Sequence, residues 1–541
     1  MPLVLRVGFR DGIFSLLMNR VFISILLGAI TSTVVAVDWN QWRGNDRNGV
    51  VKDGIPLLNY WKDDGPKLLW RSETIPSGDN GGHGSVLVEG GKAYISLVWH
   101  DDKPSENREI NDLILRKIGY RNLSFSKQLI VKMEKARESI NPRLRGHKLN
   151  DWAEQWVSNN LSQEQSKRNG SWIIGRFKKG RAAIPYNDMH YIAQKGNQSF
   201  LNDEALKKWV ESQPIASFSK RQIIKAIPNT VRVAKDVILC LDSSTGKTLW
   251  KTEAPGEPTG RKSSSTPCIF RGRLFVAGST HIYCVNAING KQIWSARLPK
   301  RGKGPASSVL FHDEKVFLIA GKLIAYDSKT GNQIWVNDDV RSSSSSPLIW
   351  AHQKNKWIIC SERKAYVAVN PDTGDTLWRT IGGGDSSPTV SSDWMVVYSK
   401  DKSIGLAAYR LTEEGANLIW NIPMAERRAQ SSPLIYGGHV YLAGGDWQMC
   451  VELTTGKLRW KESRQSTITS PVIADGKLIT LEKKGSDLVM VDTNIKAYRQ
   501  LGKTRIKAMW CPSPVIVDGK LYLRMKDNIS CYDLRAEPSV Q

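Results

Sequence analysis

The sequence lacks the cysteine pairs that define a disulfide framework or a redox centre. Seven cysteines occur, an odd number, with no CxxC motif and no two adjacent. Several lie within apolar strand-like runs, as Cys240 and Cys360 do, which favours their interpretation as small buried hydrophobic residues. The eight histidines are scattered without metal-ligand spacing. We therefore assign no catalytic residue and no metal ligand from the sequence.

Acidic residues are in deficit. There are 77 Lys and Arg residues against 52 Asp and Glu residues, which gives a net charge of +25 and a pI near 9.7. Such a balance favours anionic partners, either phospholipid headgroups, nucleic acid, an acidic polysaccharide or an acidic protein, and does not choose among them. The hydrophobic content of 40% excludes wholesale disorder and allows a sizeable core.

Long apolar runs are rare, and the first of them predicts export. Arg6, Arg10 and Arg20 precede a run from Val21 to Ala36, which at about 16 residues is short of the roughly 20 that span a membrane. Small residues end this run, so residues 1–36 are predicted to be a signal peptide. If translation begins at Met18, residues 1–17 are a mis-called start. An uncleaved N-terminal membrane anchor is the alternative interpretation of this run. We expect a location in the periplasm or cell envelope, where nucleic acid is not an expected partner.

Tryptophan recurs at a regular interval. Six tryptophans end short segments of the type Thr-Gly-x-x-x-Trp, with spacings of 44, 41, 43, 42 and 40 residues: Trp250, Trp294, Trp335, Trp378, Trp420 and Trp460. A Ser/Thr-Pro pair recurs in phase, at Thr266, Ser346, Ser387, Ser432, Ser470 and Ser513, with degenerate copies at Ser308 and Ser85. A fixed period near 40 residues indicates a repeat architecture.

One repeat unit, Ser432 to Trp460, predicts four short antiparallel strands separated by glycine-containing turns. Such a unit is typical of a propeller blade, and the tryptophan is expected to form a wedge between neighbouring blades. Eight units are present, and the last lacks its fourth strand. Residues 66–70 (PKLLW) supply a matching strand at the other end of the chain. We therefore predict an all-β fold, an eight-bladed β-propeller of four-stranded antiparallel blades.

The repeat is interrupted in the first blade. Residues 99–232 are basic and mainly helical, with apolar residues at helical spacing over 110–118, 126–140, 149–161 and 204–211. The resulting division is 1–36 signal peptide, 37–98 N-terminal segment with the ring-closing strand and the start of the first blade, 99–232 basic helical insertion, and 233–541 remaining blades. The insertion is either a solvated helical cap or a docking module for an acidic partner. Its expected contacts are Arg143, Arg145, Lys148, Arg176, Lys178, Lys179 and Arg181.

The repeated segments resemble a known family. Tyr326 to Trp335 (YDSKTGNQIW) and Leu241 to Trp250 (LDSSTGKTLW) are similar to the repeat of the pyrroloquinoline-quinone-like, or quinoprotein dehydrogenase-like, β-propellers. The opening Asp38 to Asn45 also resembles exported bacterial proteins of this class. The family includes dehydrogenases and non-enzymatic outer-membrane assembly scaffolds. The dehydrogenases hold their quinone with an adjacent Cys-Cys disulfide and Ca²⁺, and because this chain has no such pair, the resemblance favours the non-enzymatic envelope branch.

Loops between each tryptophan and the next Ser-Pro are expected to reach the propeller axis. They carry mostly basic residues, which predicts an anion-attracting mouth. The candidate cofactor-binding residues are Arg261, Arg301, Arg341, Asp385, Arg427, Arg464 and Arg505. In the alternative interpretation, these loops are solvated and point away from the propeller axis.

Three functions remain for this architecture. The preferred one is a non-catalytic exported scaffold that binds an envelope protein or another anionic partner, with peripheral membrane association left open and no cofactor assigned. The first alternative is a quinone-dependent oxidoreductase with pyrroloquinoline quinone and Ca²⁺ on the axis. The second is a polysaccharide-binding propeller that uses Trp394, Trp447 and Trp510 as sugar platforms.

Overall fold

The computed structural model describes residues 38–52, 54–62, 64–259, 263–299, 304–342, 344–424 and 430–537. The predicted signal peptide and the alternative start lie outside these residues. In the described part of the chain, no helix is long and apolar enough to cross a membrane.

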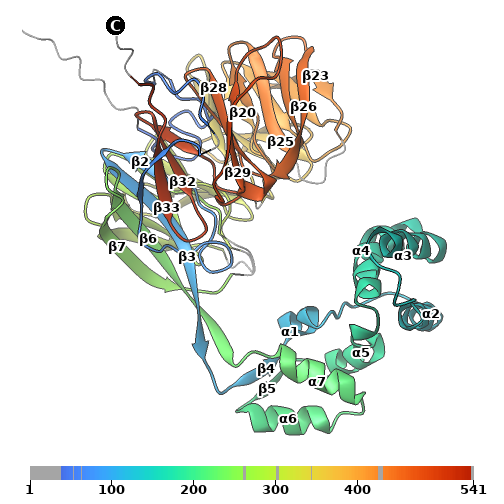
Figure 1. Cartoon of the computed structure of the whole chain (residues 1–541). Helices are drawn as coiled ribbons and strands as arrows, with labels where there is room; N and C mark the ends of the chain where they lie inside the picture. The colour runs from blue at the N-terminus through green and yellow to red at the C-terminus, as the bar shows by residue number, and fades with distance from the viewer. Residues whose placement is uncertain are drawn as a thin grey trace, which may run out of the picture. The chain divides into compact units, whose positions relative to one another are not determined.

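The described chain is mostly β and is built from antiparallel propeller-type sheets (Figure 1). Sheet 1 contains β2 (Leu87–Glu89), β3 (Lys92–Pro104), β6 (Thr230–Asp242) and β7 (Thr248–Gly256). Sheet 2 contains β8 (Cys268–Phe270), β9 (Arg273–Ala277), β10 (His281–Asn286) and β11 (Gln292–Arg297). Sheet 3 contains β12 (Leu310–His312), β13 (Lys315–Ile319), β14 (Leu323–Asp327) and β15 (Gln333–Asn337). Sheet 4 contains β16 (Leu348–His352), β17 (Asn355–Ser361), β18 (Ala365–Val369) and β19 (Thr376–Ile381).

The second half of the chain continues the pattern. Sheet 5 contains β20 (Thr389–Ser391), β21 (Trp394–Tyr398), β22 (Leu406–Thr412) and β23 (Gly415–Ile422). Sheet 6 contains β24 (Leu434–Tyr436), β25 (His439–Glu452) and β26 (Leu458–Thr467). Sheet 7 contains β27 (Val472–Ala474), β28 (Lys477–Glu482), β29 (Asp487–Asp492) and β30 (Gln500–Arg505). Sheet 8 contains β31 (Val515–Val517), β32 (Lys520–Arg524), β33 (Ile529–Asp533) and β1 (Lys67–Arg71).

Two features of this topology matter for the site. Strand β1 pairs with β33, with Lys67 opposite Asp533 and Trp70 opposite Cys531, so a strand from the N-terminal part completes the last sheet. In sheet 6, the second and third strands of the unit read from the sequence run on as the single strand β25, through Gly444 and Gly445. Sheet 6 therefore has three strands where the repeat predicts four.

The recurring tryptophans pack against the turn glycine of the following sheet. A Cβ added to Gly246 would lie 2.3 Å from Cε3 of Trp70, and one added to Gly331 would lie 2.5 Å from Cε3 of Trp294. The indole Nε1–H of Trp294 donates to the backbone oxygen of Ser328 at 2.9 Å, and that of Trp70 donates to Ser243 at 3.0 Å. The predicted tryptophan wedge is therefore present, and it uses both an apolar face and a hydrogen bond.

Seven α-helices are described between β3 and β6 in the chain (Figure 1). They are α1 (Asp112–Lys117), α2 (Lys127–Glu138), α3 (Gly146–Asn160), α4 (Gln163–Lys179), α5 (Tyr186–Gln194), α6 (Asp203–Glu211) and α7 (Ser217–Ala226). A short two-stranded sheet joins β4 (Arg108–Ile110) to β5 (Gln198–Phe200). The sequence pattern missed α4, α5 and α7. The other four helices lie within or close to the predicted ranges.

The helices share a core of their own. Met133, Ile173 and Met189 are fully buried in it. A capping box begins α4, where Ser162 Oγ accepts from the Gln165 N–H and the Gln165 side chain accepts from the Ser162 N–H. β3 and β6 stay paired from Lys92–Asp242 out to Pro104–Thr230, and the chain enters and leaves the helices through this ribbon.

Candidate functional site

One cavity lies where the segments that precede the first strand of each sheet meet. Every sheet supplies lining residues, and Trp42 completes the wall. The lining residues are His83, Ser85, Ser264, Ala306, Ser308, Ser344, Ser346, Asp385, Ser387, Gln430, Ser432, Ile468, Ser470, Cys511 and Ser513. Its volume is about 80 Å³, well below the roughly 300 Å³ at which ordinary small-molecule sites begin. We call it the axial cavity.

The Ser/Thr of each Ser/Thr-Pro pair links neighbouring sheets. The Ser346 N–H donates to Ser387 Oγ at 2.7 Å, and the Ser308 N–H donates to Ser346 Oγ at 2.9 Å. Equivalent bonds run from Ser85 to Thr266, Thr266 to Ser308, Ser387 to Ser432, Ser432 to Ser470 and Ser513 to Ser85. These residues are buried. The repeated hydroxyl therefore has a structural role, because it satisfies a buried N–H of the preceding sheet.

The segment 39–51 packs against the first strands of several sheets. Trp39 forms an antiparallel bridge with Val88 in sheet 1, and Val50 forms a parallel bridge with Ile473 in sheet 7. The Ile269 N–H of sheet 2 donates to the Asn40 oxygen at 2.8 Å. We call residues 39–51 the N-terminal segment. It holds Trp42 against the axial cavity.

Two buried arginines anchor this segment. Arg43 is 1% exposed and donates to Thr389 Oγ1 at 2.8 Å and to the Pro433 oxygen at 2.5 Å. Arg47 is 4% exposed and donates to the Val309 oxygen at 2.8 Å. Burial lowers the pKa of Arg43 to about 9 and that of Arg47 to about 10. No direct signal for this role is present in the sequence, because arginine pairs in a polar segment are usually solvated.

The seven residues of the predicted axial anion site lie in different places. Arg261, Arg301 and Arg427 lie outside the described residues. Asp385 lines the axial cavity and lies 3.5 Å from Lys400 Nζ. Arg464 is buried, where it donates to the Leu481 oxygen and lies 3.9 Å from Glu482 Oε1.

The other two described arginines lie elsewhere. Arg341 is exposed and donates to the Asp338 oxygen of its own loop at 3.1 Å. Arg505 is exposed and lines a different cavity with Lys67 and Tyr532. Of the predicted site, the structure therefore brings only Asp385 to the axial cavity among the residues it describes.

A tricarboxylate quinone does not fit the axial cavity. Among the described lining residues, none is a lysine or an arginine, and Asp385 would repel an anionic ligand. The described residues hold no group of three or more His, Cys, Asp or Glu residues that could bind a metal ion. Six of the seven cysteines are buried, and burial raises the pKa of Cys268 and Cys284 to about 12. We derive no chemistry through a quinone.

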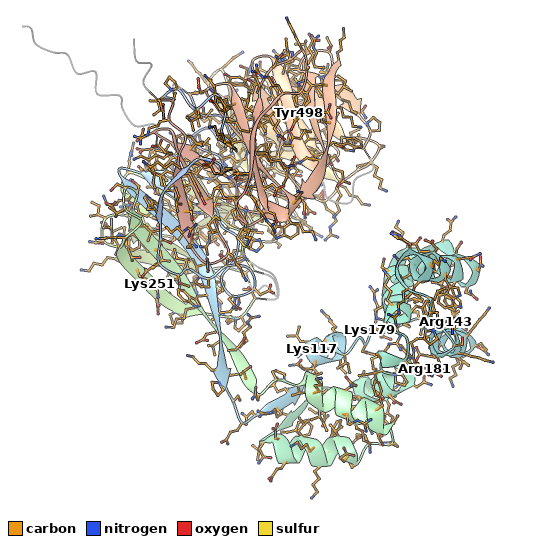
Figure 2. The ribbon with its side chains drawn as sticks, viewed as in Figure 1. Lys117, Arg143, Lys179, Arg181, Lys251 and Tyr498 are labelled. Carbon is orange, nitrogen blue, oxygen red and sulfur yellow. The ribbon has the colours of Figure 1, made fainter. Side chains whose placement is uncertain are left out.

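The basic helical region presents a cluster of exposed cations. The loop between α3 and α4 is short, so the two helices run side by side in opposite directions, as the 5.1 Å separation of the Trp152 and Phe177 rings also shows. The start of α3 therefore lies near the end of α4. Figure 2 labels Arg143, Lys179 and Arg181 here. Six of the predicted contacts are exposed: Arg143, Arg145, Lys148, Lys178, Lys179 and Arg181.

Arg176 differs from the other predicted contacts. It is 4% exposed, forms an ion pair with Glu134 at 2.6 Å and donates to the Ile184 oxygen at 2.9 Å. Glu134 also pairs with the buried Arg137 at 2.9 Å. The assignment of Arg176 as a surface contact is therefore wrong, because a shared carboxylate holds it inside the helical core.

The three proposed sugar platforms are half-buried. Trp447 carries Lys461 Nζ at 3.8 Å from its ring centroid, and Trp394 carries the Arg410 guanidinium at 5.3 Å. These two rings each have a face covered by a cation, which leaves less surface for stacking on a sugar. Trp510 is half-buried as well. Their geometry gives the polysaccharide-binding alternative no support.

The repeated sheets, the tryptophan wedges and the serine links define a β-propeller repeat protein. A family model described as "Outer membrane protein assembly factor BamB" matches residues 234–380 and 363–537, which together are more than half of the chain. The chain belongs to this family. The resemblance to the pyrroloquinoline-quinone-like propellers is thereby confirmed.

Among curated relatives, tetrathionate hydrolase of Acidithiobacillus ferrooxidans is 25% identical over 276 residues, which cover 46% of this chain and 54% of that protein. Outer membrane protein assembly factor BamB of Yersinia pestis is 24% identical over 232 residues, covering 38% of this chain and 56% of that protein. The chain thus spans about half the length of the curated relatives it matches.

Solved structures are similar at lower identity. BamB from Moraxella catarrhalis matches with 14% identity and a TM-score of 0.45, covering 56% of this chain and 89% of that chain. A europium-containing methanol dehydrogenase matches with 12% identity and a TM-score of 0.42, covering 54% and 80%.

Proposed function

We propose that the protein is a non-catalytic, exported scaffold that binds a protein of the cell envelope. The observation that carries this proposal is the match of residues 234–537 to the outer-membrane assembly factor family. The small axial cavity, with one carboxylate and no lysine or arginine among its described lining residues, agrees with a binding role in preference to quinone chemistry. The signal-like residues 1–36 agree with a place in the periplasm.

The scaffold is an eight-bladed propeller in this proposal, with the helices as an insertion in the first blade. Eight sheets of three or four strands are described, and the serine links run from sheet 1 through sheet 7, with a further link from sheet 8 back to sheet 1. The pairing of β1 with β33 supports ring closure, since it leaves no open sheet at either end. The proposed divisions are 1–36, 37–98, 99–232 and 233–541.

The helical region is the proposed docking surface. Arg143, Lys148 and Lys179 are exposed, and no ion pair is recorded for them among the described residues. Exposed like charges at this density attract an acidic surface and speed its encounter, and the attraction falls with salt. The partner chemistry that fits is an envelope protein with an acidic face.

The test is co-purification of the tagged full chain from the envelope fraction of its native cell after crosslinking. The triple charge reversal Arg143→Glu, Lys148→Glu, Lys179→Glu is compared with Lys247→Glu, Lys291→Glu, Lys457→Glu, three exposed lysines in turns of the sheets. We expect a defined envelope protein to be lost about tenfold with the first variant and retained with the second. Equal loss in both variants, or recovery of the chain only from the cytoplasm, would contradict the proposal.

A calorimetric titration separates this proposal from the oxidoreductase alternative. Pyrroloquinoline quinone with Ca²⁺ is added to the full chain, and no saturable one-to-one binding is expected. Saturable binding that Asp385→Asn changes would move the function to a quinone enzyme.

A further inference from the structure

A second, larger cavity lies between the N-terminal segment and sheets 3, 4 and 5. Its volume is about 510 Å³. The side facing the sheets is formed by the inner strands β12, β16 and β20, and the opposite side by Gln41 and residues 45–48 with Lys52. We call it the inner groove.

The residues at its wall have equivalents in the other sheets. One position of the repeat lies three residues after the linking Ser/Thr. It is occupied by Val88, Ile269 and Ile473 in sheets 1, 2 and 7, and by Ile349 and Val390 in sheets 4 and 5. Val88 exchanges both backbone hydrogen bonds with Trp39, and Ile473 bonds to Gly49 and Val51. In sheets 1, 2 and 7 this position is therefore where an extended chain pairs with the inner edge.

Sheet 4 presents the same edge without such a partner. In the β16–β17 pair, His352 lies opposite Asn355 at the turn, so the alternation of an antiparallel ladder turns the N–H and C=O of Ala351 and Ile349 away from β17. Among the described residues, the structure records no hydrogen bond from these groups to the N-terminal segment. Ala351 is exposed, Ile349 is half-buried, and both line the inner groove.

We propose that the inner groove binds an extended segment of a partner protein, which adds as a strand to the edge of β16 at Ile349 and Ala351. The N-terminal segment is the template for this mode, because it occupies the equivalent edges of sheets 1, 2 and 7 within the same molecule. Backbone pairing supplies the affinity, and the lining, which is mostly polar with the apolar Phe311, Ile349 and Val390 on the side of the sheets, accepts side chains of alternating character. A strand-forming peptide in which apolar and polar residues alternate has the matching chemistry.

None of the basic helical residues takes part in this site. The inference therefore goes beyond the proposed function, and either can fail without the other.

The probe is a fluorescein-labelled, capped hexapeptide of alternating Val and Thr, added to the full chain and followed by fluorescence anisotropy. Its matched control is the same peptide N-methylated at alternate residues, which removes backbone donors and leaves the side chains. We expect saturable binding of the first peptide and a loss of about tenfold or more with the second, since two backbone hydrogen bonds are removed. Hydrogen exchange of residues 348–352 should slow when the first peptide is bound.

Two protein variants locate the site. Ala351→Trp fills the groove without removing a backbone group, and Ile349→Pro removes one N–H at a position where the hairpin does not use it. Both should weaken binding about tenfold, and Ile435→Pro, the equivalent change in sheet 6 away from the groove, should leave it within twofold.

Three outcomes would overturn the proposal. They are the absence of saturable binding at millimolar peptide, equal binding of the N-methylated peptide, and binding that Ala351→Trp leaves unchanged. Self-association of the chain that the peptide does not compete with, but that Ala351→Trp abolishes, would assign the groove to a second copy instead.

Discussion

Gly331 lies directly against the indole of Trp294, so that a Cβ at Gly331 would lie 2.5 Å from Cε3 of that ring. Gly331 also has a φ of +77°, in the left-handed region. The glycine thus meets two demands at once, the turn of its own sheet and close contact with the preceding sheet. The same relation joins Gly246 to Trp70 and Gly374 to Trp335.

This contact predicts that Gly331→Ala destabilises the protein more than its turn conformation alone requires. The positive φ costs about 1 to 2 kcal/mol for alanine, and the clash with Trp294 adds roughly 1 to 3 kcal/mol. The matched control is Gly321→Ala, at φ +84° with open space around a Cβ. Guanidinium unfolding of both variants should separate the two costs. Equal destabilisation would show that the wedge tolerates a methyl group.

The serine links predict a second stability effect. In Ser346→Ala the buried Ser308 N–H loses its acceptor, and an unpaired buried donor costs about 1 to 3 kcal/mol. The control is Ser295→Ala on the exposed face of β11, with an expected change within about 0.5 kcal/mol. The free energy of unfolding in urea measures both. A cost for Ser346→Ala no larger than the control would remove the structural role of the repeated hydroxyl.

Because two buried arginines share the carboxylate of Glu134, we expect the loss of this carboxylate to destabilise the helical region. Glu134 contacts Arg176 at 2.6 Å and Arg137 at 2.9 Å, and both arginines are buried. Glu134→Ala leaves two buried cations without this partner, which costs about 3 to 5 kcal/mol. Hydrogen exchange of α2, α4 and α5 should accelerate.

The control for Glu134 is the exposed pair of Glu164 and Arg168, 2.8 Å apart. Glu164→Ala should cost only about 0.5 kcal/mol, because solvent screens an exposed ion pair. Slow exchange retained in Glu134→Ala would mean that the apolar helical core is sufficient.

A buried thiol predicts loss of stability at alkaline pH. Burial raises the pKa of Cys284 from 9.0 to about 12. Above about pH 9 the unfolded thiol loses a proton that the folded thiol keeps, so the free energy of unfolding falls as pH rises, by up to about 1.4 kcal/mol per pH unit for this one group. Cys284→Ala should show a shallower fall than the unmodified chain between about pH 9 and 11. Parallel curves would mean that Cys284 ionises normally in the folded protein.

Several features of the fold were predictable because they are local or periodic. The interval between Trp250 and Trp294 indicates a repeat, and the Thr-Gly turn before each tryptophan fixes where two strands meet. The last repeat unit lacks a fourth strand and residues 66–70 match that strand, which predicts their pairing with the C-terminal strands. The helices α1, α2, α3 and α6 were visible in their spacing, whereas α4 carries too many polar residues on its exposed faces to stand out.

The candidate site was less predictable. Arg176 was predicted as a surface contact, yet it is buried against Glu134, which lies 42 positions away in the sequence. The burial of Arg43 had no signal in the sequence, because its acceptor Thr389 is 346 positions away. Arg341 and Asp385 both lie in loops between a tryptophan and the next linking serine, five and two residues before that serine, yet of the two only Asp385 lines the axial cavity. The charge of a loop can be read from the sequence, whereas the direction of a side chain depends on the residues that surround it in the folded protein.

The sequence by itself determined the repeat, its strands and turns, and the basic character of residues 99–232, since each depends on residues close together in the chain. Only the tertiary structure decided that the Ser/Thr hydroxyls link sheets, that the N-terminal segment occupies the inner edges of sheets 1, 2 and 7, and that β16 keeps an edge free of that segment. These depend on hydrogen bonds between residues tens to hundreds of positions apart, and a linear pattern does not encode which distant acceptor a donor will meet.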